Sequence, residues 1–153
     1  MNKMLLFPFT KTTEIRRLVP MCRILIVEDN PTFRQMLKEI LYSRFPTMKI
    51  AEEPDGSELF PRIETFRPNI IFMDIRLPGE NGLELTKKIK LKYQDITVIV
   101  LTSYDLPEYR QAARENKADH FVTKDSPTQD FLALVESILL VKNLDTNKNR
   151  EVF

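Results

Sequence analysis

Glycine is scarce in this chain of 153 residues, which holds only Gly56, Gly79 and Gly82. A dinucleotide-binding fold needs a glycine-rich turn after its first strand, and a P-loop needs glycines around the phosphates. The first apolar run of this chain ends instead in Glu28-Asp29-Asn30-Pro31. The sequence therefore excludes both kinds of nucleotide-binding enzyme.

Cysteine and histidine are scarcer still, with one residue of each. Because Cys22 is alone, an internal disulfide is excluded, and we expect a core cysteine in a reducing, cytoplasmic compartment. His120 has no second histidine and no cysteine cluster with which to share a zinc ion, so we interpret it as structural. These two absences exclude a disulfide scaffold and a zinc site.

Long hydrophobic runs and charge of one sign are also missing. No run reaches the roughly 18 apolar residues of a membrane span, and the patch Met4–Phe9, interrupted by Pro8, is too short for a signal peptide. The net charge is +1, which gives no general reason to bind nucleic acid. We interpret the densest basic cluster as a solvated helix face: Lys87, Lys88, Lys90 and Lys92. We therefore expect one domain that binds neither membrane nor nucleic acid directly.

From Cys22 onward, short apolar runs alternate with helix-period stretches. The runs cover 24–27, 48–51, 70–73, 97–101 and 120–123. Apolar stripes at helical spacing lie at 33–41, 59–66, 85–89 and 131–139, and a weaker one lies at 107–115. Such alternation is typical of βα units and a parallel sheet. We predict an α/β fold, a doubly wound five-stranded parallel sheet with five helices on its two faces, over residues 21–144.

Helix starts and stability differ along this pattern. Asn30 before Pro31 and Ser126 before Pro127 each place a side-chain acceptor at a helix N-cap and proline at the first helical position. The fourth helix, 107–115, has few large apolar side chains to bury. We expect this helix to be the one most free to move.

Acids, hydroxyls and one lysine follow the predicted strands, where ligands bind in this architecture. They are Glu28, Asp29, Asp74, Thr102, Ser103 and Lys124. Acids at adjacent strand ends repel one another, so keeping them ionised requires a cation, and hard oxygen ligands with room for water favour Mg²⁺. A carboxylate beside that cation and a lysine is well placed to attack a phosphoryl group. Singly each residue has a structural explanation, such as a helix cap, but together they predict a phosphoryl-transfer site.

Four segments resemble the signature regions of bacterial response-regulator receiver domains. They are Ile24–Asn30, Ile70–Gly79, Val100–Ser103 and Phe121–Asp125. The resemblance covers about residues 22–144 and implies the flavodoxin-like (βα)5 receiver fold. It also implies a cytoplasmic signalling protein of a two-component phosphorelay, rather than an enzyme that acts on other molecules. Such a protein catalyses only its own phosphorylation and dephosphorylation.

The same resemblance assigns roles to residues. Asp74 is the phosphoacceptor, which becomes a 4-aspartylphosphate. Asp29, Asp74 and the backbone carbonyl of Arg76 ligate Mg²⁺, and Glu28 completes the acidic pair through water. These four residues form the implied metal site.

The remaining roles concern the response to phosphorylation. Lys124 pairs with the phosphoryl group, Thr102 is the switch hydroxyl, and Phe121 is the switch aromatic. The phosphoryl donor is a histidine kinase or a phosphotransfer protein. A downstream protein or a second copy is expected to dock on the face made by the fourth helix, fifth strand and fifth helix.

Two features depart from the family pattern. Asp125 follows the lysine where proline is usual, and Lys124-Asp125-Ser126-Pro127 is similar to receivers attached to LuxR- and NarL-type outputs. Beyond Leu144 only a polar tail, 145–153, follows, and we expect residues 1–20 to be a dispensable extension or a mis-assigned start before Met21. The chain is thus either a free-standing receiver or the receiver part of a longer DNA-binding regulator.

Two other interpretations compete with a working receiver. A haloacid-dehalogenase-like phosphatase also uses a strand-end aspartate with Mg²⁺, but it places a second aspartate two residues on, where this chain has Arg76. A pseudo-receiver that never takes phosphate would be a pure interaction module. Binding of beryllofluoride, a phosphoryl mimic, separates the pseudo-receiver from the working receiver.

Overall fold

Parallel strands form one sheet in a computed structural model that describes residues 22–151, with side chains for residues 22–142. The strands are β1 (Arg23–Val27), β2 (Lys49–Glu53), β3 (Ile70–Met73), β4 (Thr97–Thr102) and β5 (His120–Thr123). Their order in the sheet is β2-β1-β3-β4-β5, and every neighbouring pair is parallel. The predicted five-stranded parallel sheet is confirmed.

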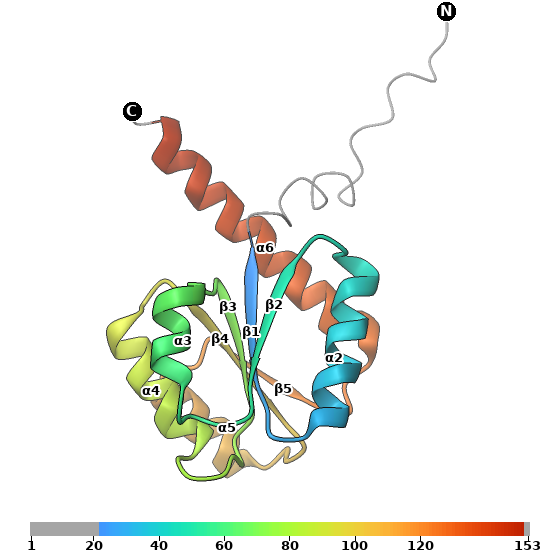
Figure 1. The fold of residues 1–153 in the computed structure, drawn as a ribbon, viewed down its shortest axis with the longest axis vertical. Helices are drawn as coiled ribbons and strands as arrows, with labels where there is room; N and C mark the ends of the chain where they lie inside the picture. Colours follow the sequence, from blue (N-terminus) through green and yellow to red (C-terminus); the bar gives the residue numbers. More distant parts are fainter. Residues whose placement is uncertain (1–21, 152–153) are drawn as a thin grey trace, which may run out of the picture.

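Helices join the strands and cover both faces of the sheet (Figure 1). They are α2 (Pro31–Arg44), α3 (Leu59–Phe66), α4 (Gly82–Lys92), α5 (Pro107–Glu115) and α6 (Thr128–Glu151). One hydrophobic cluster packs α2 and α6 on β1, β3 and β4, and the others pack α3, α4 and α5 on the opposite face. This doubly wound arrangement confirms the predicted fold class.

The core follows the alternation of side chains along buried strands. Ile24, Ile26 and Phe72 belong to the cluster under α2 and α6, whereas Leu25 and Ile71 belong to the cluster under α3 and α4. All four residues of β3 are buried, as expected for a central strand covered on both faces. Cys22 is buried in the first cluster, which confirms its predicted place in the core.

Two strands agree with the sequence to the residue, the central β3 and the edge strand β5. The run 70–73 is the strand β3, but the predicted 48–51 is shifted to Lys49–Glu53 because β2 pairs with Arg23–Val27 residue by residue. The last helix continues to Glu151, well beyond the stripe at 131–139 and the expected domain limit at Leu144. The proposed extension, 1–20, lies outside the described residues. Within residues 22–151, no helix combines the length and apolar character that crossing a membrane requires.

Two local predictions were wrong. Lys90 is not on a solvated face, because only 12% of its side chain is exposed and its ammonium binds Asp119 at 2.8 Å. It also donates to the backbone carbonyl of Ile96 at 2.8 Å, so it ties α4 to β4 and β5. Ser126 does not cap α6, because its hydroxyl bonds the hydroxyl of Thr123 at 2.9 Å and the helix begins at Thr128.

Candidate functional site at the carboxyl ends of the strands

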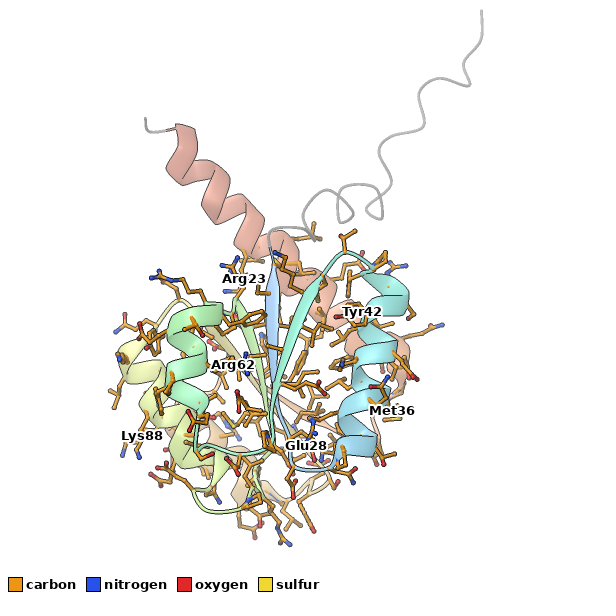
Figure 2. All side chains as sticks on the ribbon, in the orientation of Figure 1. Arg23, Glu28, Met36, Tyr42, Arg62 and Lys88 are labelled. Atoms are coloured by element: carbon orange, nitrogen blue, oxygen red, sulfur yellow. The ribbon has the colours of Figure 1, made fainter. Side chains whose placement is uncertain are left out.

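Three carboxylates meet where β1 and β3 end. Glu28 and Asp29 follow β1, Asp74 follows β3, and one carboxylate oxygen from each lies within 4.8 Å of the others. Glu28 and Asp74 are buried, with 3% and 7% of their surface exposed, whereas Asp29 is exposed. Figure 2 shows Glu28 at the opposite end of β1 from Arg23. The structure therefore brings together the three acids that the sequence singled out.

Sheet hydrogen bonding holds these acids in place. The backbone N–H of Asp74 donates to the carbonyl of Val27 at 3.0 Å, so pairing of β1 and β3 continues one residue beyond the strand. The N–H of Glu28 likewise donates to the carbonyl of Glu53 at 3.1 Å. Both buried carboxylates thus stand on backbone fixed by the sheet rather than on a free loop.

Gly82 lies at the end of the loop that follows Asp74, where α4 begins. Its N–H donates to the carbonyl of Ile75 at 2.9 Å, and a Cβ at this position would lie 1.8 Å from the backbone oxygen of Asp74. No other residue type fits that approach without moving the backbone. Sequence reasoning missed this role for Gly82; the Asn81-Gly82 pair ahead of a helical stripe was the available signal.

Lys124 reaches the acids from the end of β5. Its ammonium lies 2.7 Å from Glu28 Oε2 and 3.4 Å from Asp74 Oδ2, and 16% of its side chain is exposed. Its backbone N–H donates to the carbonyl of Thr102 at 2.8 Å, which extends the pairing of β4 and β5. The structure thus places Lys124 beside Asp74, with the closer ion pair to Glu28.

Burial raises the pKa of Glu28 above its ordinary value, because a carboxylate loses hydration in the interior. The hydrogen bond from Lys124 opposes this rise in pKa, and the charge of Asp74 adds to it. Positive charge brought to this pocket would relieve the cost of ionising two buried neighbours. The electrostatics of the site therefore favour a bound cation.

The two predicted switch residues lie on the neighbouring strands β4 and β5. Thr102 ends β4, is fully buried, and its hydroxyl accepts from the N–H of Tyr104 at 3.2 Å. Phe121 on β5 is half-buried against the cluster that contains Ala113 of α5. The guanidinium of Arg110 lies 4.7 Å from the centroid of the Phe121 ring. Phe121 is thus covered on its outer side by α5.

Arg76, the expected source of a backbone ligand, has its side chain turned to the start of α5. Its guanidinium lies 3.8 Å from the centroid of the Tyr104 ring and donates to the hydroxyl of Tyr104 at 3.0 Å. It also donates to the hydroxyl of Tyr109 at 3.3 Å. The loop after Asp74 is therefore connected to α5 through one side chain.

Comparison with known proteins agrees with this geometry. Residues 24–136 match the family model described as the response regulator receiver domain. The chain belongs to this family. A receiver is a signalling module of two-component response regulators rather than an enzyme of metabolism, and receivers bind Mg²⁺ at an acidic pocket of the kind seen here.

Curated relatives are similar to this receiver over its length. The transcriptional regulatory protein DegU of Brevibacillus brevis is 30% identical over 119 residues, which cover 78% of this chain and 49% of that protein. The oxygen regulatory protein NreC of Staphylococcus haemolyticus is 28% identical, covering 76% of this chain and 54% of that one. The chain spans about half the length of the curated relatives it matches.

Solved structures agree with the fold. A CheY-like receiver domain protein from Methanospirillum hungatei JF-1 superposes with a TM-score of 0.73 at 26% identity, covering 81% of this chain and 98% of that one. A LuxR-family DNA-binding response regulator from Staphylococcus aureus gives 0.68 at 26% identity, with 77% and 98% covered. The first neighbour is described as a receiver domain protein and the second as a response regulator, in line with the family match.

Proposed function

We propose that this receiver takes a phosphoryl group on Asp74 from a phosphohistidine of a histidine kinase or phosphotransfer protein. A carboxylate oxygen of Asp74 attacks phosphorus, the phosphorus–nitrogen bond breaks, and the electron pair leaves with the imidazole. The product is an acyl phosphate on Asp74. The chain catalyses only this transfer and the later dephosphorylation, in which water attacks phosphorus and releases inorganic phosphate and the free carboxylate. The observation that carries the proposal is the cluster of three carboxylates with a lysine ammonium 3.4 Å from Asp74.

The residues present fit Mg²⁺, because the cluster offers hard oxygen ligands and leaves one acid, Asp29, exposed to solvent. Asp29, Asp74 and the backbone carbonyl of Arg76 would hold the ion, and Glu28 would reach it through water. When bound, Mg²⁺ neutralises the oxygens of the incoming phosphoryl group. The protein's part is to keep two buried carboxylates on fixed backbone.

Lys124 and Thr102 supply the other groups that face the phosphoryl oxygens in this proposal. The Lys124 ammonium pairs with one oxygen, exchanging a carboxylate partner for a phosphoryl partner. The Thr102 hydroxyl leaves the N–H of Tyr104 and donates to another oxygen. Both residues are adjacent across β4 and β5, since Lys124 N–H donates to the Thr102 carbonyl at 2.8 Å.

Movement of Thr102 is proposed to switch the surface made by α5, β5 and α6. As the hydroxyl turns toward the phosphoryl group, it vacates space beneath α5, and Phe121 rotates into that space. Phe121 carries no hydroxyl, so its inward state depends on packing alone. A downstream protein or a second copy of the chain then binds the altered surface.

The proposal is tested by intact-protein mass spectrometry after incubation with acetyl phosphate. The wild-type protein should gain one phosphate in the presence of Mg²⁺ and none in its absence, and Asp74→Asn should gain none. Asp55→Asn, an acid in the loop before α3, serves as the matched control and should be labelled normally. A label that persists in Asp74→Asn would move the phosphoacceptor elsewhere, and no label in the wild type would favour a pseudo-receiver.

A second candidate is that the chain is the receiver part of a longer DNA-binding regulator. It is favoured by the length of the relatives, of which the chain covers about half. In either case we propose that the protein works in the cytoplasm, where the lone thiol of Cys22 stays reduced.

A further inference from the structure

The ammonium of Lys124 lies over the ring of Phe33, 4.4 Å from the ring centroid. A cation within about 6 Å of an aromatic centroid is attracted by the negative face of the ring. The same ammonium bonds Glu28 and approaches Asp74, and 16% of the side chain is exposed. Lys124 is therefore held by two carboxylates and one uncharged aromatic face.

A chain of hydrogen bonds also connects Phe33 to the acidic cluster and fixes the position of its ring. Phe33 lies in the first turn of α2, where its N–H donates to the Asn30 side chain at 3.1 Å. The N–H of Asn30 in turn donates to Glu28 Oε1 at 3.1 Å, and Glu28 Oε2 bonds Lys124 at 2.7 Å. These contacts form a closed circuit of four residues, so the position of the ring and that of the ammonium are coupled.

Phosphoryl transfer changes the two carboxylate partners of Lys124 but not its contact with the Phe33 ring. Asp74 becomes an acyl phosphate, and Glu28 lies in the cluster proposed to share its charge with a cation. The Phe33 ring takes part in neither event and keeps its place, since Phe33 is partly buried against the core cluster of α2 and α6. The aromatic face is thus the partner that remains while the ammonium exchanges a carboxylate for a phosphoryl oxygen.

We propose that Phe33 is a positioning residue for Lys124, holding the ammonium over the phosphoryl site through the face of its ring. This inference rests on the proposed phosphorylation of Asp74. Without the ring, the Lys124 side chain would keep its charge but would move more widely within the apolar cavity beside it. Phe33, Met36 and Leu37 line this cavity together with the loop after β5. The ammonium would then meet the incoming anion in a smaller fraction of encounters.

The first test compares phosphorylation rates with acetyl phosphate. Phe33→Leu should slow labelling of Asp74 roughly three- to tenfold, the range expected for a partly desolvated cation–π contact, and Phe33→Trp should keep most of the rate. Met36→Ala alters the same cavity on an exposed side chain of α2 (Figure 2) and is the matched control, with an unchanged rate. Equal slowing in Met36→Ala and Phe33→Leu would overturn the proposal in favour of a packing effect.

The second test separates positioning from general packing. In a Lys124→Met background, Phe33→Leu should cause no further slowing, because the ring acts through the ammonium. The same fold-loss in both backgrounds would overturn the proposal.

A third measurement needs no phosphoryl donor. The ε-CH₂ protons of Lys124 should be shifted upfield in NMR spectra of the wild type, and this ring-current shift should vanish in Phe33→Leu but not in Met36→Ala. An unshifted Lys124 signal would overturn the proposal. If the shift is present while Asp74 takes no phosphate, the proposed phosphorylation fails and the ring–ammonium contact stands, so the two failures are distinguishable.

Discussion

Helices α4 and α5 cover the same face of the sheet but are anchored very differently. In α4, five residues are buried: Gly82, Leu83, Leu85, Thr86 and Ile89. In α5, Ala113 is the buried residue. The Asn81 side chain caps α4 by accepting from the N–H of Leu83, whereas Leu106 gives α5 no side-chain cap.

Exposed polar contacts, rather than buried apolar side chains, hold α5 in place. Arg76 donates to Tyr109, Arg110 pairs with Asp105, and the Arg110 guanidinium covers Phe121. Such exposed contacts stabilise little and re-form easily in other geometries. Helix α4, which follows Asp74, therefore keeps the site rigid. Helix α5 has the low local stability that a movable surface needs.

The largest expected effect is at the start of α4. Gly82→Ala should lower the free energy of unfolding by at least about 4 kcal/mol, because the new methyl would collide with the backbone oxygen of Asp74. Urea denaturation measures this loss. Gly79→Ala is the control, because nothing lies within 4 Å of its Cβ position, and only its positive φ of 78° is strained. That strain should cost about 1 to 2 kcal/mol, and equal losses at the two glycines would contradict the close approach at Gly82.

The difference in burial gives the next prediction. Leu85→Ala in α4 should cost about 3 kcal/mol, as expected for a fully buried leucine, whereas Tyr109→Ala in α5 should cost about 1 kcal/mol because its ring is only half-buried. Both values come from urea denaturation of the Mg²⁺-free protein. A loss at Tyr109 as large as that at Leu85 would show α5 to be as firmly anchored as α4.

The sequence predicted all five strands, but some of their boundaries better than others. The central strand Ile70–Met73 was predicted residue for residue, because a buried strand reads as a continuous apolar run. The edge strand β2 ends in Glu52 and Glu53 and was displaced, since its register is set by pairing with β1 rather than by its own pattern. The half-buried edge strand β5 was nevertheless predicted residue for residue at His120–Thr123, so an edge position alone does not prevent an accurate prediction.

Residues that act across loops were missed for a different reason. The need for glycine at position 82 comes from a backbone oxygen eight residues earlier, and the proposed role of Phe33 on α2 comes from Lys124, which follows β5. Lys90 was assigned to solvent because its neighbours in the sequence are basic, whereas its partner Asp119 lies directly before β5. Distances of this kind depend on the packed fold and have no local signature.

A smaller effect is expected in the coupling of the site to α5. Beryllofluoride should change amide hydrogen exchange over residues 103–115 and around Phe121, and should leave α4 nearly unchanged. Thr102→Ala should still take phosphate on Asp74 but lose most of this response, which corresponds to a coupling of about 1 to 3 kcal/mol. Equal responses in the wild type and Thr102→Ala would show that the hydroxyl does not couple the site to α5.

The smallest effect concerns the ion pair that covers Phe121. The hydrogen bond from Arg110 lowers the pKa of Asp105 below its ordinary value, and the positive charge of Arg110 acts in the same direction. A lowered pKa in the folded state stabilises the protein above the unfolded pKa, and this stabilisation is lost as pH falls through the folded pKa.

In Arg110→Ala the pKa of Asp105 should return toward its ordinary value, which a carbon-13 NMR titration of the carboxyl group measures. Because both side chains are exposed, the urea midpoint at neutral pH should hardly change, but amides near Phe121 should exchange faster once the ring loses its cover. Asp55, whose lowered pKa depends on Ser57 instead, is the internal control and should titrate as in the wild type. An unchanged Asp105 titration in Arg110→Ala would mean that the pair does not persist in solution, and that packing against the hydrophobic cluster that contains Ala113 keeps Phe121 in place.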